Sequence, residues 1–138
     1  MVKKVTSIIG IGKRKTAIAR AVIKNGTGRT RINKQVLQNF STPFFNKLLL
    51  RETLELASDR ALKVNINVNV KGGGTNSQIQ AIRTAIGDAM LKFYKNDEDL
   101  RKTFVEHDRS IIVSDTRRKE MNKPYRSKAR SRRQKSKR

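Results

Sequence analysis

Residues 64–93 read VNINVNVKGGGTNSQIQAIRTAIGDAMLKF, and they contain a strand followed by a helix. Apolar residues alternate with asparagine from Val64 to Val70, which predicts a strand with one apolar face and one polar face. Three glycines then end the strand, and Thr75, Asn76 and Ser77 can cap the start of a helix. Apolar residues recur at helical spacing after this cap, so we expect the helix to supply the centre of the core. The six predicted core residues are Ile79, Ile82, Ile86, Ala89, Met90 and Phe93.

Upstream of this stretch, alternation at period two continues in a more basic part of the chain. Residues 14–23 place small or apolar residues at every second position, which predicts another strand. Residues 25–28 read NGTG, which favours a turn, and residues 29–33 resume the alternation. We therefore expect residues 14–23 and 29–33 to form a basic β-meander. Apolar spacing of three to four predicts short helices over the sheet at residues 34–40 and 43–56.

The pattern changes after residue 115. Residues 97–107 predict another short helix, and residues 110–113 predict a brief extended segment. Beyond Asp115 apolar residues are rare, Pro124 interrupts any helix, and cations occur at almost every second position. Such a segment cannot bury enough apolar surface to order itself alone. We expect a globular α+β domain over residues 1–116 and an extended tail over residues 117–138 that takes one path only on its partner.

Charge is the strongest compositional signal. The 138 residues include 33 Lys and Arg but only 11 Asp and Glu, which gives a net charge of +22. Residues 1–51 carry 12 basic and no acidic residues, residues 52–116 carry 9 basic and 10 acidic ones, and residues 117–138 carry 12 basic residues and one acid. Two one-sided blocks around a neutral centre are typical of a binding face and a binding tail. Nucleic acid is the expected partner, because phosphate neutralises such blocks.

Other site chemistries lack support in the composition. The chain has no cysteine and one histidine, so neither a disulfide nor a metal site is expected. The sequence shows no pattern typical of a catalytic carboxylate pair or of a nucleophile with a general base, so we expect no catalysis. The first residues lack the pattern of a secretory signal, and no segment approaches the length of a membrane span. A cytoplasmic protein is therefore expected.

The basic stretch GIGKRKTAIARA at residues 10–21 raises the question of a nucleotide-binding loop. A phosphate loop needs a glycine five residues before its Gly-Lys pair and a hydroxyl directly after it. Ser7 and Arg14 occupy those two positions, so the spacing excludes this motif. The remaining interpretation is a basic strand that faces the phosphates of RNA. The competing hypotheses are an architectural DNA-binding protein and a phosphotransfer enzyme with an unusual ATP loop.

Several short motifs together are similar to those of one family. The motifs are residues 12–21 (GKRKTAIARA), 31–33 (RIN), 70–74 (VKGGG), Gln78, residues 81–83 (AIR) and residues 136–138 (SKR). In this combination the chain resembles the small-subunit ribosomal protein nine family over nearly its whole length. Asp115, Arg117, Arg118 and residues 129–130 and 132–136 are most similar to its archaeal and eukaryotic members, whereas Lys137 and Arg138 are similar to the bacterial ending.

The resemblance implies a fold and a set of partners. The implied fold is α+β, a two-layer sheet with helices in a split β-α-β arrangement with a left-handed crossover, plus the extended basic C-terminal tail. In this family the globular domain binds small-subunit rRNA in the head of the subunit. The tail reaches the anticodon loop of the tRNA in the peptidyl site. The implied partners are this rRNA, this tRNA and neighbouring head proteins, with no membrane, no cofactor and no homo-oligomer.

The resemblance, together with the charge pattern, also assigns residues to these contacts. Phosphate contacts of this kind position a protein without reading base sequence. The tRNA-binding candidates are Ser136, Lys137 and Arg138. The rRNA-binding candidates are Lys13, Arg14, Lys15, Arg20, Arg29, Arg31, Lys71, Gly72, Gly73, Gly74, Arg83, Arg117, Arg118, Lys123, Arg126, Lys128, Arg130, Arg132, Arg133 and Lys135.

Overall fold

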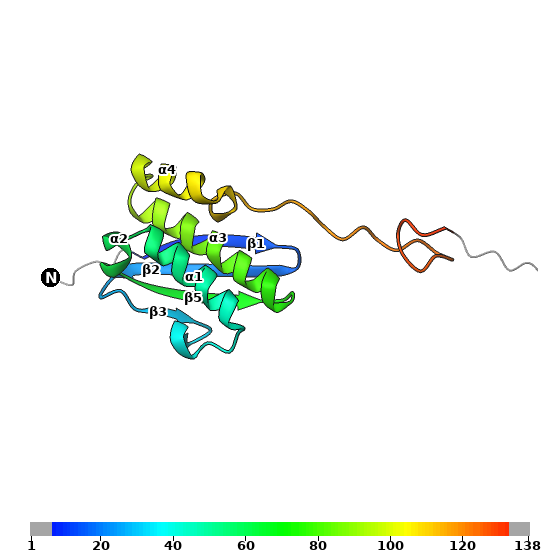
Figure 1. The fold of residues 1–138 in the computed structure, drawn as a ribbon, viewed down its shortest axis with the longest axis horizontal. Coiled ribbons are helices and arrows are strands. Elements are labelled where there is room, and N and C mark those ends of the chain that lie inside the picture. The colour runs from blue at the N-terminus through cyan, green and yellow to red at the C-terminus, as the bar shows by residue number, and fades with distance from the viewer. Residues whose placement is uncertain (1–6, 133–138) are drawn as a thin grey trace, which may run out of the picture.

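The computed structural model describes residues 7–132, in which helices cover one face of a five-stranded sheet (Figure 1). This two-layer arrangement confirms the predicted α+β fold class. The strands are β1 (Ile8–Arg14), β2 (Ala17–Asn25), β3 (Thr30–Ile32), β4 (Gln35–Val36) and β5 (Val64–Lys71). The helices are η1 (Leu37–Asn39), α1 (Phe44–Leu56), α2 (Asp59–Leu62), α3 (Thr75–Phe93), α4 (Glu98–His107) and η2 (Arg109–Ile111).

The sheet has the strand order β1-β2-β5-β3-β4. β5 lies between β2, to which it is antiparallel, and β3, to which it is parallel. The predicted meander of residues 14–23 and 29–33 is therefore wrong, because these strands do not pair with each other. The loop at residues 25–28 crosses the end of β5 instead of forming a hairpin. It is held there because the amides of Gly26 and Gly28 donate to the carbonyls of Lys63 and Val64.

The connection from β3 to β5 runs through α1 and α2, over the helical face of the sheet (Figure 1). Strands β3 and β5 are parallel. When the sheet is viewed from its helical side with these strands pointing up, β5 lies to the left of β3, so the connection is left-handed (Figure 1). Most parallel crossovers are right-handed, so local sequence pattern could not have indicated this handedness. In this β-α-β unit the two parallel strands are direct neighbours with no strand between them, so the split arrangement implied by the resemblance is wrong in that detail.

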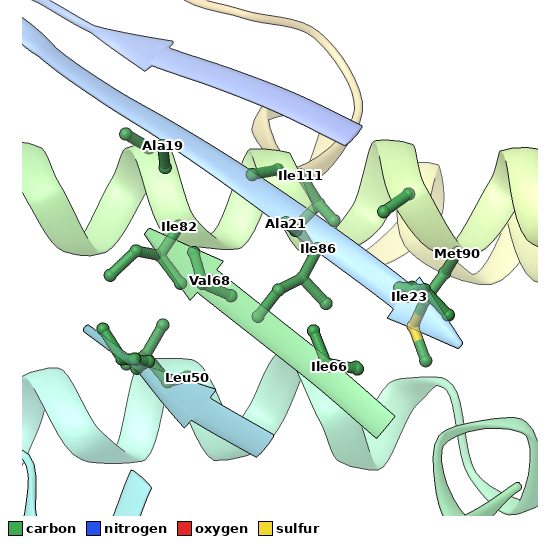
Figure 2. Packing of buried hydrophobic residues seen from close by; sticks show 14 of the residues in the cluster. Ala19, Ala21, Ile23, Leu50, Ile66, Val68, Ile82, Ile86, Met90 and Ile111 are labelled. Atoms are coloured by element: carbon green, nitrogen blue, oxygen red, sulfur yellow. The ribbon is translucent and has the colours of Figure 1, made fainter. Parts of the chain in front are cut away.

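The core lies between α3 and the sheet, where α1 and η2 add further side chains (Figure 2). β2 contributes the predicted small residues, and Ala17, Ala19 and Ala21 are fully buried. The apolar face of β5 is buried as well, as its alternation predicted. Five of the six predicted core residues on α3 are buried, whereas Phe93 is partly buried. The strongest sequence pattern therefore identified the core correctly.

Two glycines let α3 approach β1 very closely. Gly10 and Gly12 are buried in the middle of β1, on the side that faces the helix. A Cβ atom at Gly12 would lie 2.0 Å from the carbonyl oxygen of Ala81, and one at Gly10 would lie 2.4 Å from that of Ala85. The glycine pair therefore serves helix packing inside a strand. This geometry contradicts the hypothesis of an ATP-binding loop at residues 10–15.

The outer elements match the sequence predictions in part. α1 and α4 confirm the helices predicted at residues 43–56 and 97–107. The helix predicted at residues 34–40 is reduced to the 3-10 turn η1, because Asn33 and Lys34 take positive φ angles of 46° and 70° and turn the chain back on β3 as β4. Residues 110–113 are not extended. Asp108 accepts a hydrogen bond from the Ser110 amide and starts η2 there.

Beyond η2 the described chain contains neither helix nor strand up to residue 132, and it leads away from the sheet (Figure 1). Asp115 attaches the start of this segment to β1 through an ion pair with Arg14. Further along, Glu120 pairs with Arg130 at 2.9 Å and closes the intervening residues into a loop. The proposed domain boundary between residues 116 and 117 falls just after the Asp115 contact.

Candidate nucleic-acid interface

The face of the sheet opposite the helices is an uninterrupted set of exposed or half-exposed side chains. The strand register aligns these side chains in rows across β1, β2 and β5. One row contains Lys13, Ile18 and Lys71, and the next contains Ile11, Arg20 and Asn69. We call this surface the open face. It comprises Ile9, Ile11, Lys13, Ile18, Arg20, Val22, Lys24, Arg31, Asn65, Asn67, Asn69 and Lys71.

The open face contains cations, amides and apolar residues, and none of its residues is acidic. Its lysines and arginines repel one another, so the face is stabilised when a polyanion covers it. Ile9, Ile11 and Ile18 are 54%, 51% and 42% exposed and offer apolar contact beside the charges. A ribose-phosphate chain has charged phosphates for these cations and less polar sugar surfaces for these isoleucines. The arrangement therefore suits RNA bound across the strands.

Arg29 and Arg31 lie at the border of the open face, next to two asparagines. The Asn65 side-chain oxygen accepts hydrogen bonds from the amides of Thr27 and Arg29, at 3.0 and 3.1 Å. These bonds hold the loop before β3 against β5. A small cavity of about 120 Å³ is lined by Arg29, Arg31, Asn65 and Asn67. The structure thus brings two of the predicted rRNA-binding arginines together.

The predicted glycine triplet lies beside the turn between β1 and β2. Gly72 and Gly73 have φ angles of +76° and +68°, and a Cβ atom at Gly72 would lie 2.6 Å from the Thr16 carbonyl oxygen. Gly74 is the N-cap of α3 and Thr75 is already its first helical residue, so the capping predicted for Thr75, Asn76 or Ser77 is wrong. Exposed Lys15 lies on the same turn as Thr16. Lys15 on this turn and Lys71 directly before Gly72 therefore put two exposed cations near the start of a 19-residue helix, where the helix dipole also favours an anion.

Arg14 does not join the other cations of its basic stretch. It lies on the helical side of β1, and its side chain is only 19% exposed. Its guanidinium pairs with Asp115, so it attaches the tail to the domain. Of the cations predicted in this stretch, the structure brings Lys13 and Arg20 to the open face and leaves Lys15 at the turn.

The surface position predicted for Arg83 is wrong, because this residue is only 7% exposed. Its guanidinium donates to the Thr53 hydroxyl at 3.2 Å and to the Glu52 carboxylate at 3.3 Å. It also lies 3.4 Å from the Asp108 carboxylate. Arg83 therefore joins α1, α3 and the segment after α4. Because Arg83 is buried beside two carboxylates in the helical layer and does not lie on the open face, we infer that it serves the fold.

Asp108 shows the electrostatic effect of this cluster. Partial burial acts to raise its pKa, but hydrogen bonds from Ser110 and the charges of Arg83 and His107 outweigh burial and lower the pKa below its ordinary value of 3.8. A carboxyl whose folded pKa is lowered stabilises the fold above its unfolded pKa. This contribution is lost as the pH falls through the lowered value. The cluster is therefore intact at neutral pH.

Replacing Arg83 by alanine is expected to lower the free energy of unfolding by about 2–3 kcal/mol, because Glu52 and Asp108 lose their shared cation. Urea denaturation of the full chain measures this loss. The matched control is Arg101→Ala, on the exposed surface of α4, where we expect a change within about 0.5 kcal/mol. Unchanged stability combined with weakened rRNA binding would instead return Arg83 to the interface.

The tail candidates in the described part of the chain are all exposed. Arg117 and Lys123 have 79% and 57% of their side chains exposed, although each lies near a carboxylate. The predicted contacts at Arg133, Lys135, Ser136, Lys137 and Arg138 lie outside the described residues. The exposed tail candidates are Arg117, Arg118, Lys123, Arg126, Lys128, Arg130 and Arg132.

Lys24 is an open-face cation that the sequence analysis missed. The predicted strand ended at Ile23, whereas β2 continues to Asn25. Lys24 lies on the same face as Arg20 and is paired in register with Asn65. Extending the alternation by one step would have found it.

Comparison with known proteins identifies the family. Residues 12–138 match the family described as ribosomal protein S9/S16. The chain belongs to this family. The S9/S16 match spans every predicted rRNA- and tRNA-binding residue, and it confirms the family predicted from the motifs.

The relatives of this S9/S16 chain include proteins named small ribosomal subunit protein uS9. The one from Methanococcus maripaludis is 44% identical over 128 residues, which cover 91% of this chain and 94% of the relative. The one from Methanococcus vannielii is 45% identical over the same shares of both chains. The one from Picrophilus torridus is 42% identical over 129 residues, which cover 94% of this chain and 96% of the relative.

Between residues 7 and 132, no group of three or more histidine or carboxylate side chains could hold a metal ion. Over the same range, no helix is long and apolar enough to cross a membrane.

Proposed function

We propose that the chain is a non-catalytic structural component of the small ribosomal subunit in the cytoplasm, and that it binds small-subunit rRNA through the open face and the tail. The observation that carries this proposal is the absence of acids on the open face of an S9/S16 family member. Neutralising rRNA phosphates with lysine and arginine releases bound counterions, which drives association. The two-layer domain holds these cations at fixed spacing.

In this proposal the domain and the tail have separate roles. The open face, the glycine triplet and the arginines before and in β3 position the domain on folded rRNA. The Arg14–Asp115 ion pair fixes where the tail leaves the domain. The tail then follows rRNA in the head of the subunit and brings Ser136, Lys137 and Arg138 to the backbone of the anticodon loop of peptidyl-site tRNA. Neighbouring head proteins complete the surroundings.

Sedimentation of a cell lysate through a magnesium-containing gradient tests the assignment to the ribosome. We expect the chain to travel with small subunits and to remain there at moderate salt. A companion competition assay compares small-subunit rRNA with duplex DNA at matched salt. Equal affinity for the two, together with sedimentation away from subunits, would favour an architectural DNA-binding protein.

Deleting Lys137 and Arg138 is expected to weaken retention of peptidyl-site tRNA by about tenfold, because two charged contacts to the tRNA backbone are lost. Filter binding of tRNA to purified small subunits measures the effect. The control exchanges the two residues, Lys137→Arg with Arg138→Lys, which keeps both charges and should keep tRNA binding. Normal retention by the truncated subunits would refute the role of the tail end.

A further inference from the structure

A second cavity lies at the β3–β4 edge of the sheet, next to the open face. It has a volume of about 470 Å³ and lies between β3, the β4–η1 segment and α1. Val36, Leu37 and Leu54 supply an apolar floor. Cavities of this size accept small organic groups when polar side chains converge on an apolar floor. The remaining lining residues are Gly28, Arg29, Thr30, Arg31, Gln38 and Arg51.

Three arginines surround this cavity, and the residues that line it include no acid. Among the described residues, no carboxylate forms an ion pair with the guanidinium of Arg29, Arg31 or Arg51, whereas Arg60 is paired at 2.6 Å. Guanidinium groups that have no acidic partner are free to bind a phosphate bidentately or to stack on a planar base. The site therefore fits a ligand with an anionic part and a flat apolar part.

The cavity is continuous with the proposed RNA-binding surface. Arg29 and Arg31 also line the small cavity beside Asn65 and Asn67 on the open face. On the other side, a cavity of about 420 Å³ shares Gly28, Thr30 and Leu54 with this site and carries acids further along α1 and α2. An anion is thus favoured only at the arginine end, next to the open face. This position favours RNA over an acidic peptide as the occupant.

We propose that this cavity takes one unstacked nucleotide of the RNA that lies across the open face, with its base on the Leu37 and Leu54 floor and its phosphate at the three arginines. Single bases turned out of a helix are a common target of sequence-specific RNA recognition. This inference rests on the proposed rRNA binding and deepens it. It adds Arg51 to the interface and gives the domain a contact to a base.

Arg51→Gln tests the inference, because Arg51 lies on α1 and outside the open face. The full-length Arg51→Gln chain and the wild-type chain are each bound to small-subunit rRNA. The reactivity of the rRNA bases toward dimethyl sulfate is then compared between the two complexes. We expect one or two protected bases to gain reactivity several-fold while the rest of the footprint stays unchanged. The matched control, Arg101→Gln on exposed α4, should leave the whole footprint unchanged.

A single tryptophan gives a second readout, since the chain contains none of its own. Gln38→Trp places the fluorophore at the exposed rim of the cavity, and a base that enters should stack on it and quench it. Val105→Trp on α4 is the control and should not be quenched. We expect Arg51→Gln to reduce the quenching at position 38.

The outcomes separate this inference from the proposed function. A wild-type footprint on rRNA that Arg51→Gln leaves unchanged, with no quenching at position 38, would overturn the nucleotide site and leave rRNA binding intact. The complete absence of a wild-type footprint would overturn both. If Arg51→Gln removed only a cross-link to a neighbouring protein in assembled subunits, the occupant would be an acidic peptide and the inference would be wrong.

Discussion

Replacing Gly12 by alanine is expected to lower the free energy of unfolding by about 3 kcal/mol or more, at the upper end of overpacking effects. The added Cβ atom would lie 2.0 Å from the Ala81 carbonyl oxygen and 2.6 Å from the Ala85 amide nitrogen. Both are backbone atoms of α3, so no side chain can rotate away. The helix must move off β1, and the core beneath it must open. Chemical denaturation of the full chain measures the loss.

Gly74→Ser is the matched control for Gly12→Ala. A Cβ atom at Gly74 meets nothing within 4 Å, and the residue has a φ angle of −95°, which any residue adopts. Serine is also a favoured N-cap residue, so we expect unchanged or slightly higher stability. If Gly12→Ala were as stable as wild type, the close packing of α3 on β1 would be wrong. The glycine pair would then need a functional explanation.

Removing three charges from the open face should weaken rRNA binding about a hundredfold at 0.15 M salt, since each lost phosphate contact costs counterion release. The variant is Lys13→Gln, Arg20→Gln and Lys71→Gln, which are exposed positions on three adjacent strands. The slope of log K against log salt concentration should become shallower by about 2–3. Fluorescence anisotropy of labelled small-subunit rRNA across a salt series gives both quantities.

The control for this triple variant removes the same number of charges elsewhere. The control variant is Lys95→Gln, Arg101→Gln and Lys102→Gln. Lys95 lies in the turn between α3 and α4, the other two lie on α4, and all three residues are exposed. We expect this variant to lose only a small part of the affinity, through weaker long-range attraction. Equal losses in the two variants would mean that net charge, and not the open face, determines binding.

Alternation along the chain identified much of the fold. The strand periods of residues 64–70 and 17–23 separated buried from exposed side chains correctly, because each position in a strand faces one side. Residues 14–16, predicted in the same strand as residues 17–23, instead end β1 and form the turn before β2. Alternation could not predict which strands pair with each other in the sheet. β5 lies between β2 and β3 although it is more than 30 residues further along the chain, and hydrogen bonds at residues 26–29 fix that arrangement.

Individual site residues show the same limit. Arg20 and Lys71 could be placed on one face from their strands alone. Arg83 could not be placed, because its acidic partners lie 31 residues before it and 25 residues after it. A helical pattern gives the direction of a side chain but not the elements that cover it. Arg51 was missed for the same reason, since the cavity beside it forms only when α1 packs near β3.

Lysine modification in assembled small subunits tests most directly whether the open face lies against rRNA. Subunits are treated with an acylating reagent before and after nuclease digestion, and modified residues are identified by mass spectrometry. We predict that Lys13, Lys24 and Lys71 are protected in intact subunits and become reactive once the RNA is digested. Open-face lysines that react equally in both samples would contradict the account.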